Sequence, residues 1–100
     1  MKYKYGEMSD EQLISIKNKI RKKIYFLLII VEKKYDYNLD KAISDVLLCL
    51  GGLNKLLDYP EEILVASYLI EEAREKKDEY QVYRKLILEA GSEIMKIGGE

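Results

Sequence analysis

Apolar residues recur at steps of three and four along the first third of the chain. Ser9 precedes this series and Gln12 follows three residues later, which is the arrangement of a capping box at a helix start. Side chains at such steps lie on one face of an α-helix, so the pattern predicts a first helix over residues about 10–34. The series is Leu13, Ile16, Ile20, Ile24, Leu27, Val31 and Tyr35.

A second series with the same spacing follows Asn38, a favoured N-cap residue, and predicts a helix over residues 39–57. Pro60 is the only proline of the chain and stands just beyond it. Proline is tolerated in a first helical turn, so a further helix is expected to start there. The second series is Leu39, Ile43, Val46, Leu50, Leu53 and Leu57.

Two more apolar stripes occupy residues 60–97, separated by a polar stretch that contains no glycine or proline. Helices over about 60–76 and 78–97 give an all-α, antiparallel four-helix bundle. The alternative is three helices with one long C-terminal helix over 60–97, but at 1.5 Å per residue this helix is roughly 55 Å long, too long to pack against the others. The expected organisation is a flexible tail (1–9), one helical domain (10–97) and a C-terminal tail (98–100). The two stripes are Ile63, Ala66, Ile70, Ala73 and Tyr80, Tyr83, Ile87, Ala90, Ile94, Ile97.

The first two expected helices carry more apolar residues than one face can use. The surplus residues are Tyr25, Phe26, Ile29, Ile30, Leu48 and Leu56, with Gly52 between the last two. Leaving such side chains in water forgoes roughly 1.5–3 kcal/mol each. Either the other two helices cover this hairpin on both sides, or the surplus face binds another chain, which is a second copy or a different protein.

A membrane span is not expected, although residues 24–31 are all apolar. As a helix this run is about 12 Å long, compared with roughly 30 Å for the bilayer core. Charged residues flank it on both sides and prevent its extension. Residues 24–31 are therefore expected to pack against protein and not against lipid. The residues outside the main apolar series are the predicted partner-binding residues.

The charges of the chain are unevenly distributed, although the net charge is only −1. Residues 1–34 contain nine basic and four acidic side chains, and residues 35–100 contain eight and fourteen. The two halves can neutralise each other on packing, or the basic half can bind phosphates. The candidate nucleic-acid residues are Lys2, Lys4, Lys17, Arg21, Lys22 and Lys23.

The chain lacks the side chains on which the usual catalytic mechanisms depend. The chain has no histidine, the usual general base, and its single cysteine, Cys49, stands in an apolar setting. The acidic residues at 71–79 are interspersed with basic ones, as on a solvated helix face. We expect no enzyme activity, cofactor, metal or small-molecule substrate. The polar N-terminus lacks the apolar segment of a signal peptide, which favours a cytoplasmic location.

These patterns predict a small non-catalytic protein-interaction module, namely an accessory subunit, an inhibitor or a homodimeric adaptor. It is expected to bind through the surplus apolar face of the first two helices. The alternative function is a nucleic-acid-associated regulator that uses the basic N-terminal region. Abundant Glu and Lys with few Asn and Gln are also typical of thermophile proteins.

Overall fold

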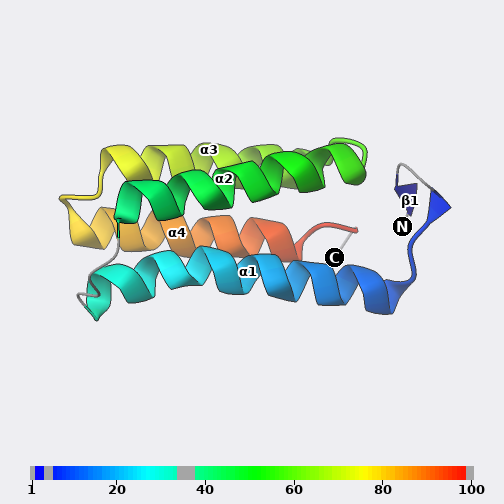
Figure 1. The fold of residues 1–100 in the computed structure, drawn as a ribbon, viewed down its shortest axis with the longest axis horizontal. Coiled ribbons are helices and arrows are strands. Elements are labelled where there is room, and N and C mark those ends of the chain that lie inside the picture. The colour runs from blue at the N-terminus through cyan, green and yellow to red at the C-terminus, as the bar shows by residue number, and fades with distance from the viewer. Residues whose placement is uncertain (1, 4–5, 34–37, 99–100) are drawn as a thin grey trace.

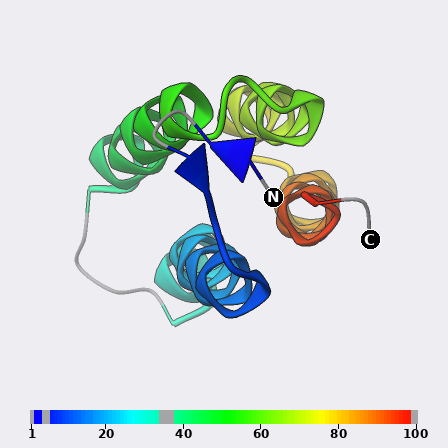
Figure 2. The same ribbon diagram turned by 90° about the vertical axis from the view of Figure 1, so that its right-hand side faces the viewer.

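The computed structural model describes residues 2–3, 6–33 and 38–98, most of which belong to four α-helices (Figure 1). Viewed end-on, the helices stand at four corners, with α1 diagonal to α3 and α2 diagonal to α4 (Figure 2). Consecutive helices lie side by side and antiparallel, and α4 also packs against α1. The predicted all-α four-helix bundle is confirmed. The helices are α1 (Asp10–Glu32), α2 (Leu39–Leu56), α3 (Glu61–Glu75) and α4 (Tyr80–Met95).

The first two helices begin at the caps that the sequence predicts. Ser9 Oγ accepts a hydrogen bond from Gln12 N at 3.1 Å, and Gln12 Oε1 accepts one from Ser9 N at 3.0 Å. Asn38 Oδ1 accepts a hydrogen bond from Lys41 N at 3.0 Å at the start of α2. These caps satisfy amide groups that have no partner within their own helix. Pro60 is the N-cap of α3, which therefore starts one residue later than predicted.

The chain turns between α3 and α4 without glycine or proline. Lys76 N donates to the Ala73 carbonyl at 3.0 Å, and Glu79 N donates to the Lys76 carbonyl at 2.9 Å. This turn folds α4 back along α3, so that both apolar stripes face one core. The alternative of a single helix over residues 60–97 is therefore wrong.

The core contains the predicted stripes of α2, α3 and α4 almost completely. Only Leu39 and Tyr80 among those residues are half-buried, and the others are buried. Tyr83 is fully buried, and its hydroxyl donates a hydrogen bond to the Leu27 carbonyl of α1 at 2.8 Å. Burial also raises the pKa of the Tyr83 phenol well above its usual value. The neutral phenol therefore joins α4 to α1 through the core.

The raised pKa of Tyr83 predicts a loss of stability at alkaline pH. A folded-state pKa above the unfolded value means that the unfolded chain releases the proton first. The corresponding stabilisation is complete below about pH 10, the pKa of an unperturbed tyrosine, and falls as the pH rises above that value. Urea unfolding between neutral pH and pH 11 should show a steeper loss for the natural protein than for Tyr83→Phe. Parallel pH profiles of the two proteins would contradict this prediction.

Lys17 lies on the core side of α1 and is only 7 % exposed. Its Nζ donates a hydrogen bond to the Ile97 carbonyl at 2.9 Å, just beyond the end of α4. A positive charge is favourable there because helix C-termini carry partial negative charge. Gly98 follows with a φ of 94°, a left-handed conformation that glycine adopts without strain. The predicted role of Lys17 as a nucleic-acid contact is therefore wrong.

Two very short strands, β1 (Lys2–Tyr3) and β2 (Gly6–Glu7), pair antiparallel before α1. The sequence did not predict this pairing. Met8 follows β2 and is buried in the hydrophobic core.

The described residues contain neither a membrane-spanning helix nor a cluster of metal-binding side chains. No helix there is long and apolar enough to span a bilayer. No group of three or more Cys, Asp or Glu side chains in the same residues has an arrangement that could hold a metal ion.

Candidate protein-binding surfaces

The six predicted partner-binding residues do not form one surface. Ile30 is only 4 % exposed, so its prediction as a contact residue is wrong. The physical reason is that α1 packs against both α2 and α4, which covers apolar residues on two sides of the helix. The core takes up Tyr25, Ile30 and Leu56, and the surface retains Phe26, Ile29 and Leu48.

Tyr25 packs beside Gly91 of α4. A Cβ atom at Gly91 would lie 2.7 Å from both Cζ and Oη of the Tyr25 ring, so only glycine lets the ring approach this closely. The Tyr25 side chain is half-buried against the core. Tyr25 therefore packs α1 against α4. The sequence instead predicts Tyr25 as a partner-binding residue.

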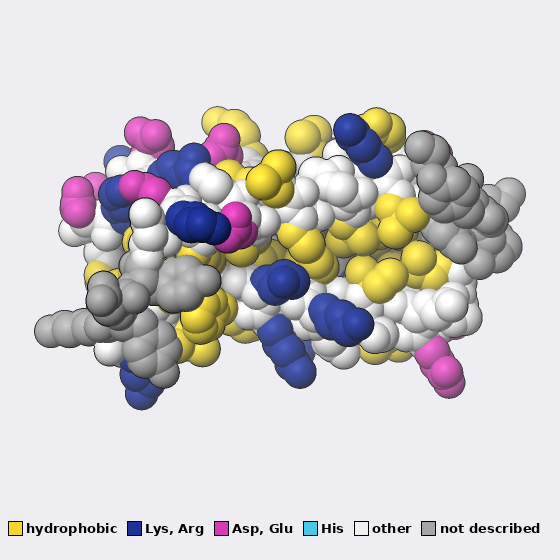
Figure 3. Space-filling model, in the orientation of Figure 1, with side chains coloured by type: hydrophobic (Ala, Val, Ile, Leu, Met, Phe, Trp, Pro, Cys, Tyr) yellow, Lys and Arg dark blue, Asp and Glu magenta, His cyan; other side chains and the backbone are white. Residues whose placement is uncertain are grey.

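An open groove of about 400 Å³ lies between α1 and α2. Phe26 and Leu27 line it from α1, and Ala42 and Val46 line it from α2. Figure 3 shows apolar side chains along the boundary of these two helices. Phe26 is 37 % exposed, and Ile29, one helical turn further along α1, is 40 % exposed. The groove thus has apolar walls and an apolar edge in contact with solvent.

Positive charge predominates beside this groove. Lys22 and Lys23 are exposed and line its α1 side. Asp45 lines the α2 side, and the basic residue Lys41 lies beside it, with Nζ 3.2 Å from the carboxylate. Residues 12–31 contain no acidic side chain, and Figure 3 shows lysine and arginine side chains gathered over α1. Apolar walls and a basic rim therefore occur together.

A second apolar surface, the α2–α3 face, covers the outer sides of these two helices. Its most exposed side chains are Leu48 (76 %), Leu64 (65 %) and Tyr68 (72 %). Gly51 and Gly52 adjoin Leu48, and a Cβ atom at either glycine would have no atom within 4 Å. Each glycine inside a helix costs about 1 kcal/mol relative to alanine. No close packing within the described chain requires either glycine.

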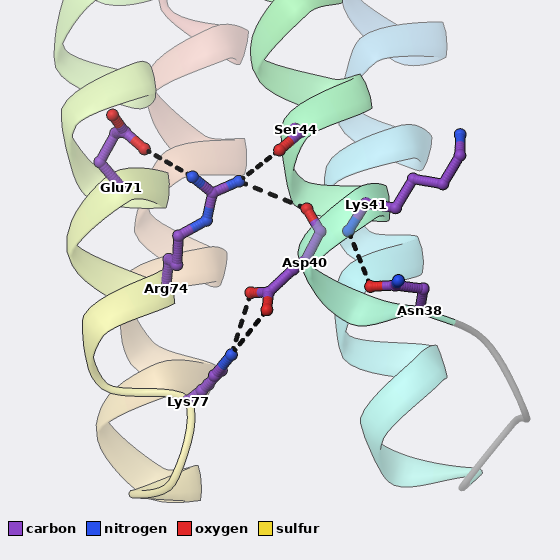
Figure 4. Close-up of polar contacts among 7 residues, drawn as sticks. All are labelled: Asn38, Asp40, Lys41, Ser44, Glu71, Arg74 and Lys77. Atoms are coloured by element: carbon purple, nitrogen blue, oxygen red, sulfur yellow. Dashed lines mark hydrogen bonds and ion pairs between the residues drawn. The ribbon is translucent and has the colours of Figure 1, made fainter.

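Polar contacts fix α2 against α3 beside this face (Figure 4). Arg74 Nη2 donates to Ser44 Oγ at 2.7 Å and to the Asp40 carbonyl at 3.3 Å. Lys77 Nζ lies 2.9 Å from the Asp40 carboxylate. These contacts set an antiparallel register that brings the middle of α3 beside the middle of α2. The two helices therefore present a single platform.

Leu64 and Tyr68 were missed by the sequence analysis, which followed only the main stripe of α3. The two residues stand four apart, outside the row of Ile63, Ala66 and Ile70. That spacing is itself a helical signal for a second apolar row on the opposite side. Leu64 and Tyr68 can therefore be recognised in the sequence as apolar residues outside the main stripe, like the surplus residues of the first two helices.

The structure places some of the predicted nucleic-acid residues on α1. Lys22 and Lys23 are exposed beside the groove, Arg21 is half-buried, and Lys17 lies in the core. The Lys2 side chain lies outside the described part of the chain. The same applies to the whole of residue 4, the other predicted lysine.

No protein-family model, curated protein or solved structure matches this chain.

Proposed function

We propose that this protein is a non-catalytic interaction module that binds an acidic amphipathic helix of a partner protein in the α1–α2 groove. The observation that supports the proposal is the combination of apolar walls with Lys22 and Lys23 at the rim. A partner helix can place apolar side chains every three or four residues against such walls. The protein then acts as an accessory subunit, an inhibitor or an adaptor.

The two parts of the groove have different roles in this proposal. Covering the exposed atoms of Phe26 and Ile29 supplies affinity, because burial of a large apolar side chain contributes up to roughly 1.5–3 kcal/mol. Lys22 and Lys23 select the partner, because charges at an interface rim act mainly on association rate and specificity. An acidic flank on the partner helix complements them, whereas a basic flank is repelled.

Two synthetic helical peptides of equal length test the proposal. Both carry leucines at helical spacing, and one has glutamate where the other has lysine. The acidic peptide should bind the protein at least about tenfold more tightly than the basic one, and this preference should shrink at high salt. Titration of the peptides in a fluorescence anisotropy assay measures both constants.

Variants locate the binding site. Phe26→Glu and Ile29→Glu should each weaken the acidic peptide at least about tenfold, because a charge then replaces an apolar contact. Leu48→Glu is the matched control on the α2–α3 face and should leave peptide binding unchanged. Equal binding of the two peptides, no binding at millimolar concentration, or full binding by a folded Phe26→Glu protein would reject the proposal.

The nucleic-acid alternative has a different signature. It depends on Arg21, Lys22 and Lys23, and phosphate contacts of this kind weaken steeply with salt. A mobility shift with single-stranded DNA should then be lost in the double variant Lys22→Glu/Lys23→Glu and be insensitive to Phe26→Glu. This pattern would favour the regulator over the interaction module.

A further inference from the structure

We propose that a second copy of this chain docks on the α2–α3 face and forms a symmetric, antiparallel dimer through α2. The face carries Leu48, Leu64 and Tyr68, the three most exposed apolar side chains among the described residues. Exposed apolar side chains that gather on one surface of a small protein are typical of an interface. The order of the exposed residues along α2 indicates that the partner is a second copy of this chain.

The outer row of α2 is complementary to itself. Asp45, Leu48, Gly52 and Lys55 are all exposed, and their spacing of three, four and three residues places them in one row along the helix. The row is symmetric about residue 50. An acidic residue stands at one end and a basic residue at the other, with a large side chain and a missing side chain between them.

A two-fold axis at residue 50 brings each residue of the row to its complement. Leu48 of each copy then lies over Gly52 of the second copy, where the absence of a Cβ atom leaves room. Asp45 of each copy lies opposite Lys55 of the second copy. Both pairs occur twice, as they must in an isologous interface.

The parallel arrangement of the same two helices lacks this complementarity. It places Leu48 against Leu48, and it brings Asp45 close to Asp45 and Lys55 close to Lys55. Like charges that face each other across an interface are unfavourable. The charges therefore select the antiparallel pairing.

Helix α3 widens the apolar part of the interface. In its antiparallel register on α2, with Lys77 at Asp40 and Arg74 at Ser44, Tyr68 lies about level with Leu48 and Leu64 about level with Gly52. Arg74 and Lys77 hold α3 in this position through their contacts with α2 (Figure 4). The second copy thus meets a surface of two helices.

This interface is distinct from the α1–α2 groove and does not rest on the proposed function. Phe26 and Ile29 lie on α1, and only Asp45, at the common edge, belongs to both surfaces. The dimer leaves both grooves available and therefore offers two binding sites to a partner.

The mass of the full chain in solution, measured by sedimentation equilibrium, tests the dimer. We expect reversible dimerisation with a dissociation constant in the micromolar range. Leu48→Glu should weaken it at least about 100-fold, because it removes two apolar contacts and buries two charges. Phe26→Glu is the control in the groove and should leave dimerisation unchanged. Circular dichroism establishes that each variant is folded.

Gly52→Gln separates the interface from the fold, because its two effects have opposite directions. A Cβ atom at this position meets no atom within 4 Å, and glutamine has a higher helix propensity than glycine, so the melting temperature of the monomer should rise. The same side chain fills the space for the second copy's Leu48 and should weaken the dimer about tenfold or more. A dimer that tolerates Gly52→Gln would overturn the proposed contact.

A charge exchange tests the orientation of the two copies. Lys55→Glu should weaken the dimer about tenfold, because two attractive pairs become repulsive. Adding Asp45→Lys re-creates opposite charges in each pair and should restore most of the affinity. The proposal fails if the natural protein is monomeric at millimolar concentration, if Leu48→Glu leaves the dimer intact, or if the double variant dimerises no better than Lys55→Glu.

Discussion

Replacing Lys17 by glutamate should lower the free energy of unfolding by about 3–5 kcal/mol, the usual cost of an uncompensated buried charge. The substitution removes the donor of the Nζ hydrogen bond to the Ile97 carbonyl. It also puts a carboxylate beside the end of α4, where the helix dipole already carries partial negative charge. Urea unfolding followed by circular dichroism measures the change.

Two further substitutions separate burial from charge at this position. Lys17→Met keeps the approximate length of the side chain but removes both the hydrogen bond and the positive charge, without adding a negative one, so we expect a loss of about 1–3 kcal/mol. Lys23→Glu makes the same change of charge at an exposed position of the same helix and should change stability by about 0.5 kcal/mol or less. Equal effects of Lys17→Glu and Lys23→Glu would show that Lys17 has no structural role.

Replacing Tyr83 by alanine should cost about 3–5 kcal/mol, because Tyr83 is fully buried and its removal leaves a large cavity. Tyr83→Phe keeps the ring and removes only the hydrogen bond to the Leu27 carbonyl, so it should cost about 1 kcal/mol. A total stability of about 5–15 kcal/mol is usual for a domain, so Tyr83→Ala consumes a large share of it. Chemical unfolding of the two variants measures both values.

The difference between the two Tyr83 variants is the informative quantity. If alanine and phenylalanine destabilise the protein equally, the hydrogen bond rather than the ring joins α4 to α1. If neither variant changes stability, the position of Tyr83 in the core is refuted.

The local sequence predicts most of the fold. The capping box at Ser9 and the cap at Asn38 form as predicted, because each depends only on residues within the same turn. The apolar stripes of the last three helices enter the core, because helical spacing alone decides which residues share a face. The break between α3 and α4 is favoured for a different reason, namely that a single helix over residues 60–97 is too long to pack against the other helices.

The local pattern gives wrong predictions where contacts with a neighbouring helix decide whether a residue is buried. Lys17 and Ile30 are the clearest cases, since hydrophobic spacing places the lysine outside the core and the isoleucine on a partner surface. In the fold, the end of α4 provides a carbonyl for Lys17, and the contacts of α1 with both neighbours bury Ile30. Both outcomes depend on residues far away in the sequence.

The sequence by itself determined the all-helical class, the starts of the first two helices and the main buried faces, since caps and helical periodicity are properties of a few neighbouring residues. It left open whether residues 60–97 form one helix or two. It also identified an excess of apolar residues in α1 and α2. Only the tertiary structure decided how this excess is divided, because coverage of a side chain depends on which helix lies beside it. The packing of α1 between α2 and α4 covers Tyr25 and Ile30. Phe26 instead lines an open groove, Ile29 is exposed one turn further along α1, and Leu48 faces solvent on another side.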